Sequence, residues 1–196
     1  MSNKIIYMKR IALFASGAGS NVENIIRYFL NSRELEFPVV ISNRHDALVH
    51  ERAKKYRIPS YYFKKSDFEN GEVLNLLREK SIDFIVLAGF LLKVPDNLLK
   101  AYPNRIINIH PALLPKFGGQ GMYGSRVHEA VVASGEKETG ITIHYVNENY
   151  DEGRIIFQAK CPVLPDDSPE DVAAKVHALE YEHFPRVIGE VALETD

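Results

Sequence analysis

The sequence predicts an α/β fold built on an open, mostly parallel twisted sheet, with helices on both faces and an antiparallel hairpin in the C-terminal half. Three observations support this prediction. Short apolar runs alternate with segments of helical spacing through residues 10–109. These runs are apolar almost throughout, which is typical of strands covered on both faces. Two longer runs of alternating character flank the turn sequence "NENYDEG", which favours a hairpin.

Each element follows from a local pattern. Strands are expected where β-branched and apolar residues run together, at residues 10–15, 37–42, 59–63, 83–90 and 105–109, and in the hairpin 139–163. Helices are expected where apolar residues recur at helical spacing, at residues 20–32, 46–57, 67–80, 95–102, 125–134 and 166–193. Ser168 is a suitable N-cap for the last helix, with Pro169 in its first turn. Repeated βα units of this kind predict a Rossmann-like sheet.

Composition narrows the functional classes. We expect the 196 residues of the chain to form a single domain, over residues 1–196. The net charge of −2 gives no electrostatic reason to expect nucleic acid or an anionic membrane as a partner. The single cysteine, Cys161, excludes an intrachain disulfide and fits a reducing cytoplasm. The N-terminal residues do not resemble a signal peptide, and no stretch approaches the ~18 apolar residues of a membrane helix.

A glycine turn, "SGAGSN" at residues 16–21, joins the first strand to the first helix. The start of a helix offers free N–H groups and a partial positive charge, which suit a phosphate. Val22 stands where a third glycine would complete a dinucleotide-binding fingerprint, and "SNRHDA" lacks the expected acidic residue after the second strand. The turn is therefore interpreted either as a site for one phosphate or as a turn that needs glycine for steric reasons.

Two polar residues, Asn108 and His110, interrupt the apolar character of the segment "INIHPALLPK". Residues two apart on a strand share a face, and ligands bind at the carboxyl ends of such strands. An amide donor can stabilise an oxyanion, and an imidazole can move a proton near neutral pH. Asp151, in the hairpin turn, is the candidate for orienting that imidazole. The alternative is that Asn108 and His110 cap the strand and hold the irregular loop expected at residues 110–124.

The remaining polar residues are weaker candidates. The seven histidines show no metal-ligand spacing, so no metal site is expected. His144, in "ITIHYV", is expected to be a hydrogen-bonded structural residue. Cys161 has no adjacent base and is expected to serve packing.

Four segments occur in an order that resembles one known family. They are "FASGAGSN", "IVLAGFLLKVP", "INIHPALLPKFGG" and "NENYDEGRIIFQAKCPV". They resemble the phosphate turn, the folate-pocket segment, the active-site signature and the aspartate loop of the phosphoribosylglycinamide formyltransferases, folate-dependent enzymes of purine biosynthesis. The resemblance spans nearly the whole chain. It implies a formyltransferase fold, with a phosphate-binding half at about residues 1–100 and a catalytic and folate-binding half at about residues 101–196.

The resemblance implies direct transfer of the formyl group of 10-formyltetrahydrofolate to the amine of glycinamide ribonucleotide, without a metal. Asn108 would bond the formyl oxygen, His110 would act as the acid at the folate nitrogen, and Asp151 would raise the pKa of His110. The implied binding residues are Gly19, Ser20, Asn21, His177 and Glu180 for the ribonucleotide, and Leu91, Leu92, Lys93, Val94 and Asn108 for the folate. The implied partners are small molecules alone, in the cytoplasm, with the chain a monomer or homodimer.

The chain departs from the family pattern at several positions. Leu92 stands where some relatives have Arg, and His177 where relatives can carry Gln. The segment "KKSDFENGEV" has no clear counterpart of an Arg that contacts the folate tail, and the loop "KFGGQGMYGSRVHEA" is longer than in some relatives. Three alternatives stay open. Two are methionyl-tRNA formyltransferase and formyltetrahydrofolate deformylase, which normally carry an added domain and are disfavoured by length. The third is a non-catalytic folate- or nucleotide-binding module, which would lack the Asn, His or Asp.

Overall fold

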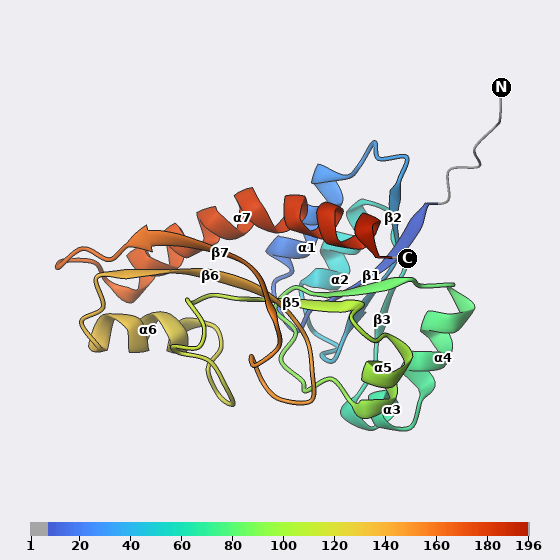
Figure 1. The fold of residues 1–196 in the computed structure, drawn as a ribbon. Coiled ribbons are helices and arrows are strands. Elements are labelled where there is room, and N and C mark those ends of the chain that lie inside the picture. Colours follow the sequence, from blue (N-terminus) through green and yellow to red (C-terminus); the bar gives the residue numbers. More distant parts are fainter. Residues whose placement is uncertain (1–7, 196) are drawn as a thin grey trace.

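One seven-stranded sheet organises residues 8–195, the part of the chain that this computed structural model describes (Figure 1). The strand order is β3-β2-β1-β4-β5-β6-β7. The strands are β1 (Lys9–Phe14), β2 (Leu35–Ser42), β3 (Ser60–Tyr62), β4 (Phe84–Leu87), β5 (Ile106–His110), β6 (Glu138–Tyr145) and β7 (Ile155–Pro162). Strands β1 to β5 are parallel, whereas β6 and β7 form an antiparallel hairpin beside β5. The predicted fold class is confirmed.

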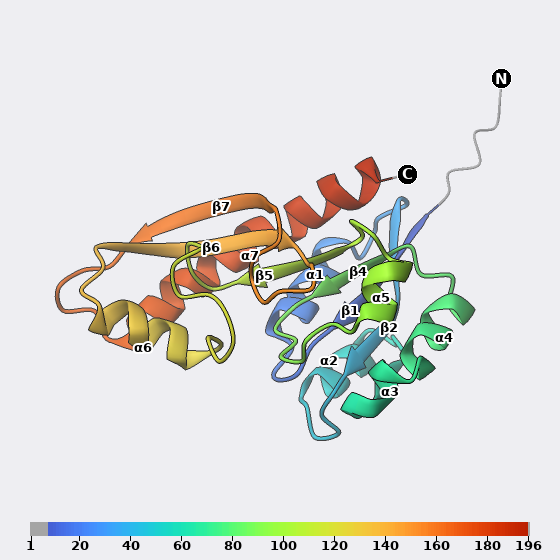
Figure 2. The ribbon, with the colours of Figure 1, turned by 60° about the horizontal axis from the view of Figure 1, so that its bottom comes forward.

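Helices cover both faces of the sheet. They are α1 (Ser20–Tyr28), α2 (Val49–Lys55), α3 (Lys65–Glu69), α4 (Glu72–Glu79), α5 (Asp96–Ala101), α6 (Ser125–Ala133) and α7 (Pro169–Glu194). Apolar residues of α1, α2 and α7 join one buried cluster with the sheet, and those of α3, α4 and α5 join a second cluster. Figure 2 shows α3, α4 and α5 gathered on the side of the sheet away from α7.

The two clusters are separated by the alternation of side chains along β1. Ile11 and Leu13 belong to the cluster with α1 and α7, whereas Ala12 and Phe14 belong to the cluster with α3 to α5. All four residues are fully buried. The part of β1 that is covered on both faces has no position for a polar residue, which explains the continuous apolar run at residues 11–14.

The helix expected at residues 67–80 is wrong in one respect, because the structure divides it into α3 and α4. Gly71 lies between them with a φ of 94°, in the left-handed region that favours glycine. The Asn70 side chain accepts a hydrogen bond from the Glu72 N–H at 3.0 Å and so starts the second helix. An Asn-Gly pair inside an apolar pattern of helical spacing therefore marks a break rather than a continuous helix.

The last helix, α7, begins as predicted. Ser168 caps it, because its hydroxyl accepts the Asp171 N–H at 3.1 Å and Asp171 accepts the Ser168 N–H at 2.9 Å. Pro185 lies inside this helix and has no N–H for the carbonyl of Tyr181. Asn24 of α1 donates to that carbonyl at 3.0 Å instead. This contact stabilises the long helix at its proline and joins it to α1.

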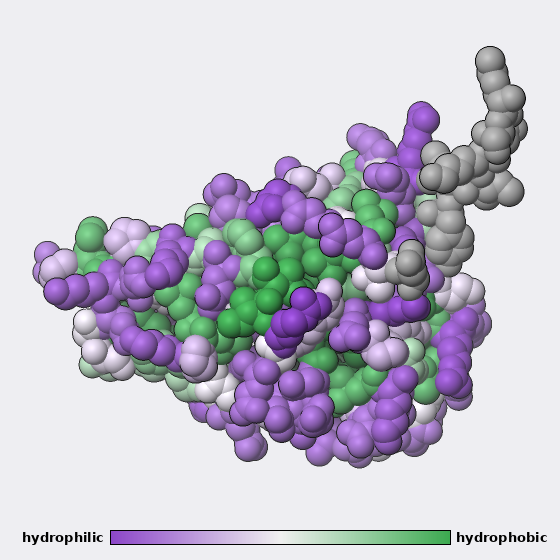
Figure 3. Space-filling view, viewed as in Figure 1, coloured by the Kyte–Doolittle hydropathy of each residue, from purple (hydrophilic) through white to green (hydrophobic). Residues whose placement is uncertain are grey.

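Within residues 8–195 no helix combines the length and the apolar character needed to cross a membrane. On the face drawn in Figure 3, hydrophobic side chains gather near the centre, and hydrophilic side chains surround them.

Candidate active site

A cavity of about 750 Å³ lies at the carboxyl ends of β1, β4 and β5. This is where an open parallel sheet normally binds ligands. All of the residues predicted for the site line this one cavity. They are Gly19, Ser20, Asn21, Leu91, Leu92, Lys93, Val94, Asn108, His110, Asp151, His177 and Glu180. The structure therefore brings together segments that are far apart in the sequence.

The glycine turn forms one wall of the cavity. Gly19 precedes α1 with a φ of 70°, and a Cβ at this position would lie 2.4 Å from Cγ2 of Val49. Glycine is therefore required for steric reasons. The same geometry leaves the first N–H groups of α1, which belong to Ser20 and Asn21, at the cavity. The two interpretations of the turn are compatible, since the glycine that the packing needs also frees the helix start for an anion.

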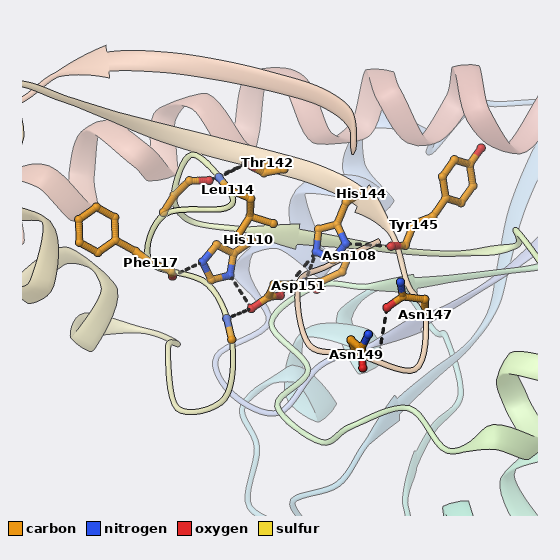
Figure 4. A network of polar contacts seen from close by, with 12 residues as sticks. Asn108, His110, Leu114, Phe117, Thr142, His144, Tyr145, Asn147, Asn149 and Asp151 are labelled. Atoms are coloured by element: carbon orange, nitrogen blue, oxygen red, sulfur yellow. Dashed lines mark hydrogen bonds and ion pairs between the residues drawn. The ribbon is translucent and has the colours of Figure 1, made fainter. Parts of the chain in front are cut away.

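The predicted Asn, His and Asp meet at the end of β5 (Figure 4). Nδ1 of His110 lies 3.5 Å from Oδ2 of Asp151. The other ring nitrogen, Nε2, donates to the carbonyl of Phe117 at 2.7 Å. A carbonyl only accepts, so this contact places the hydrogen of the neutral ring on Nε2. Nδ1, beside the Asp151 carboxylate, is therefore the atom that gains or loses a proton.

Burial and charge act in opposite directions on this pair. Burial lowers the pKa of His110 below its ordinary value, and this effect outweighs the nearby Asp151 carboxylate, which acts to raise it. Asp151 does act to raise the pKa of His110, as expected, but the net pKa of His110 is lowered. For Asp151, burial acts to raise the pKa, but His144, His110 and the Gly119 N–H together hold it below its ordinary value. Near neutral pH, both shifts favour a neutral imidazole beside a carboxylate.

His144 belongs to the same cluster. It is buried, as expected of a structural histidine, and its Nδ1 donates to the carbonyl of Tyr145 at 2.9 Å. Its Nε2 therefore accepts the side-chain N–H of Asn108, at 3.2 Å, and lies 3.6 Å from Oδ1 of Asp151. The Asn108 amide nitrogen carries a second hydrogen, and Asn108 lines the cavity. His144 thus orients the amide that can bond a developing oxyanion. The β5–β6 pairing, which places Asn108 opposite His144, makes this role possible.

The loop after β5 closes the site from one side. The irregular loop expected at residues 110–124 begins one residue later, because His110 still belongs to β5, and residues 111–124 contain no helix or strand. Gly119 donates its N–H to Oδ2 of Asp151 at 2.9 Å, and Phe117 accepts from His110. A Cβ on Gly118 would lie 3.3 Å from Cβ of Asp151, so the loop approaches closely where it holds the pair. The long loop therefore positions both His110 and Asp151.

A second polar cluster lies on α7. Oε2 of Glu180, which is 5% exposed, accepts the side-chain N–H of Asn21 at 2.8 Å and contacts Nδ1 of His177 at 2.8 Å. The hydrogen bond with Glu180 raises the pKa of His177 above its ordinary value. His128 of α6 is a cavity residue that sequence reasoning missed; it is buried, and burial lowers its pKa. Within residues 8–195, no group of His, Cys, Asp or Glu side chains could hold a metal ion.

Comparisons with known proteins show the family of the chain. Residues 9–188 match the family model described as Formyl transferase. A phosphoribosylglycinamide formyltransferase of Arabidopsis thaliana, described as chloroplastic, is 40% identical over 95% of this chain, which spans 66% of that protein. The phosphoribosylglycinamide formyltransferase of Haemophilus influenzae is 37% identical over 92% of this chain and 86% of its own length.

A solved structure is similar over the same extent. The crystal structure of phosphoribosylglycinamide formyltransferase from Anaplasma phagocytophilum superposes with a TM-score of 0.87 at 34% identity, over 96% of this chain and 89% of that chain. The family model, the two relatives and the solved structure each match nearly the whole described chain. The chain therefore belongs to the formyl transferase family, and within it to the phosphoribosylglycinamide formyltransferases.

Proposed function

We propose that this chain transfers the formyl group of 10-formyltetrahydrofolate to the amine of glycinamide ribonucleotide, in purine biosynthesis. The observation that supports this most strongly is the meeting of Asn108, His110 and Asp151 in the cavity that the glycine turn also lines. The relatives named as phosphoribosylglycinamide formyltransferases favour the same reaction over the deformylase and over a non-catalytic module.

The reaction forms one C–N bond and breaks another. The amine of the ribonucleotide attacks the formyl carbon, and the formyl oxygen gains negative charge, which the free N–H of Asn108 stabilises. The amine must lose one proton, and N10 of the folate must gain one. His110 takes this proton at Nδ1 and returns it to N10 as the C–N10 bond breaks. Asp151 stabilises the imidazolium that exists between these two steps.

Each substrate has its own part of the cavity in this proposal. The phosphate of the ribonucleotide lies at the helix start formed by Gly19, Ser20 and Asn21, and Glu180 and His177 contact the rest of that molecule. The folate lies against residues 91–94, with its formyl group at Asn108. No metal takes part.

The proposal extends to organisation and location. Residues 1–196 act as one formyltransferase domain, and the single sheet supports this. We expect a monomer or homodimer that binds small molecules in the cytoplasm, where the free Cys161 stays reduced.

The test mixes the purified chain with 10-formyltetrahydrofolate, with and without glycinamide ribonucleotide. Tetrahydrofolate, formylated ribonucleotide and free formate are measured in the same samples. We expect tetrahydrofolate to form only with the ribonucleotide, in equal amount to the formylated product. Formate release without the ribonucleotide would indicate the deformylase instead. His110→Ala should abolish turnover, whereas His45→Ala, an exposed histidine outside the cavity, should not.

A further inference from the structure

The segment after β4 forms a wall of the cavity without a helix or strand of its own. Residues 88–94 line the cavity, and α5 begins only at Asp96. Gly89 has a φ of 78°, so the chain turns sharply there. A segment of this kind keeps its place only through contacts with its neighbours.

Those contacts lead to the end of β1. The N–H of Ala88 donates to the carbonyl of Phe14 at 2.8 Å, and the N–H of Ser16 donates to the carbonyl of Gly89 at 2.9 Å. The N–H of Leu91 donates to Oγ of Ser16 at 2.8 Å. Of these three bonds, the last is the one that a side chain provides and that a substitution can remove.

The Ser16 hydroxyl is oriented by a second partner. It donates its hydrogen to Oδ1 of Asn43, which follows β2, and so keeps its lone pairs for the Leu91 N–H. Ser16 is 2% exposed, so these two protein contacts, rather than solvent, hold its hydroxyl. Three neighbouring strand ends, those of β1, β2 and β4, are therefore joined through one hydroxyl.

Ser16 also begins the glycine turn, and Gly19 lies three residues further along. We propose that Ser16 is a positioning residue for the folate substrate, because it holds the wall at Leu91 at a fixed place relative to the turn that receives the phosphate. This inference rests on the proposed function, since it assigns the folate to residues 91–94. Without the hydroxyl, the Leu91 N–H loses its protein acceptor, and the wall at residues 88–94 loses the one side-chain bond that fixes it to β1.

The test compares Ser16→Ala with Ser42→Ala in the full chain. Ser42 is a matched control, because it is fully buried at the end of β2 and its hydroxyl accepts the Arg44 N–H at 3.1 Å. For Ser16→Ala we expect the KM for 10-formyltetrahydrofolate to rise about tenfold, the effect of losing one hydrogen bond that holds the wall in place. The KM for the ribonucleotide should stay within about twofold of the wild type. Ser42→Ala should leave both values unchanged.

Two further measurements keep the inference falsifiable. Asn43→Ala removes the partner that orients the Ser16 hydroxyl but leaves the hydroxyl itself, so the folate KM should rise by less than in Ser16→Ala. Calorimetric titration with tetrahydrofolate should give a weaker Kd for Ser16→Ala in the same proportion as the KM.

A lowered melting temperature with unchanged folate KM and Kd would show a purely structural role and overturn the inference. If Ser16→Ala does not fold, an Asn43→Ala variant with wild-type folate KM would overturn it equally. Failure of the proposed function is distinct, because the wild type itself would then show no ribonucleotide-dependent transfer. In that event, an unchanged Kd for tetrahydrofolate in Ser16→Ala would still refute the positioning role.

Discussion

Asp151→Asn removes one negative charge from the site and keeps the shape of the side chain. Asp151 has a φ of 56°, in the left-handed region that Asn adopts more readily than most residues. The Asn side chain keeps an oxygen for the Gly119 N–H, which Asp151 now accepts at 2.9 Å. The loop should therefore stay in place, and the charge beside His110 is what changes.

The size of the effect follows from the distance and the burial. Nδ1 of His110 and Oδ2 of Asp151 are 3.5 Å apart, and the two side chains are 4% and 12% exposed. With an effective dielectric constant of about 20, an imidazolium and a carboxylate at this distance attract each other by about 4–5 kcal/mol. This attraction corresponds to an upper limit of about three to four decades in rate. Because the imidazolium exists only during the reaction, we expect the loss in kcat, by about 10²- to 10³-fold.

The assay is kcat at saturating concentrations of both substrates, for Asp151→Asn and for Glu152→Gln. Glu152 is the next residue in the same turn, is exposed and does not line the cavity, so its variant removes a charge without touching His110. We expect kcat of Glu152→Gln to stay within about twofold of the wild type. A loss of less than about tenfold for Asp151→Asn, or an equal loss in both variants, would refute the reasoning.

Three further predictions concern stability. Gly19→Ala should lower the free energy of unfolding in urea by more than about 2 kcal/mol, because the Cβ would lie 2.4 Å from its nearest neighbour and φ is 70°; Gly17→Ala, with open space around it, should cost much less. His177→Gln should lower the free energy of unfolding at pH 5.5, below the ordinary histidine pKa of 6.5, because the hydrogen bond with Glu180 raises the pKa of His177 in the folded protein. The difference from the wild type should shrink as the pH rises through that raised pKa. A difference in urea unfolding that does not vary with pH would contradict this. Ser168→Ala should cost about 1 kcal/mol in the same experiment, as the loss of one N-cap, and an unchanged midpoint would contradict the capping role.

The features that the sequence predicts correctly are those with a local signal. Continuous apolar runs predict the parallel strands, and the Ser168 cap predicts the start of the last helix. Asn108 and His110 are predicted to share a face because strand geometry fixes the direction of alternate side chains. The position of this pair at a cavity follows from their place at the end of a strand in a parallel sheet.

The features that the sequence does not predict depend on contacts between distant segments. The role of His144 requires the register between β5 and β6, which a residue pattern within either strand does not contain. The net lowering of the His110 pKa requires the degree of burial, which the loop at Phe117 completes. The break at Gly71 has a local signal, the Asn-Gly pair. The apolar residues on either side of it keep helical spacing, however, and that spacing predicts one continuous helix.

The most direct test of the account follows a labelled formyl group through a single turnover. The wild type, in excess over 10-formyltetrahydrofolate labelled in the formyl carbon, is mixed with glycinamide ribonucleotide and quenched at successive times. We expect the label to pass from the folate to the ribonucleotide with no label on the protein, and we expect His110→Ala to slow this transfer by orders of magnitude. Label that appears first on the protein, or transfer at the wild-type rate in His110→Ala, would contradict direct transfer through Asn108, His110 and Asp151.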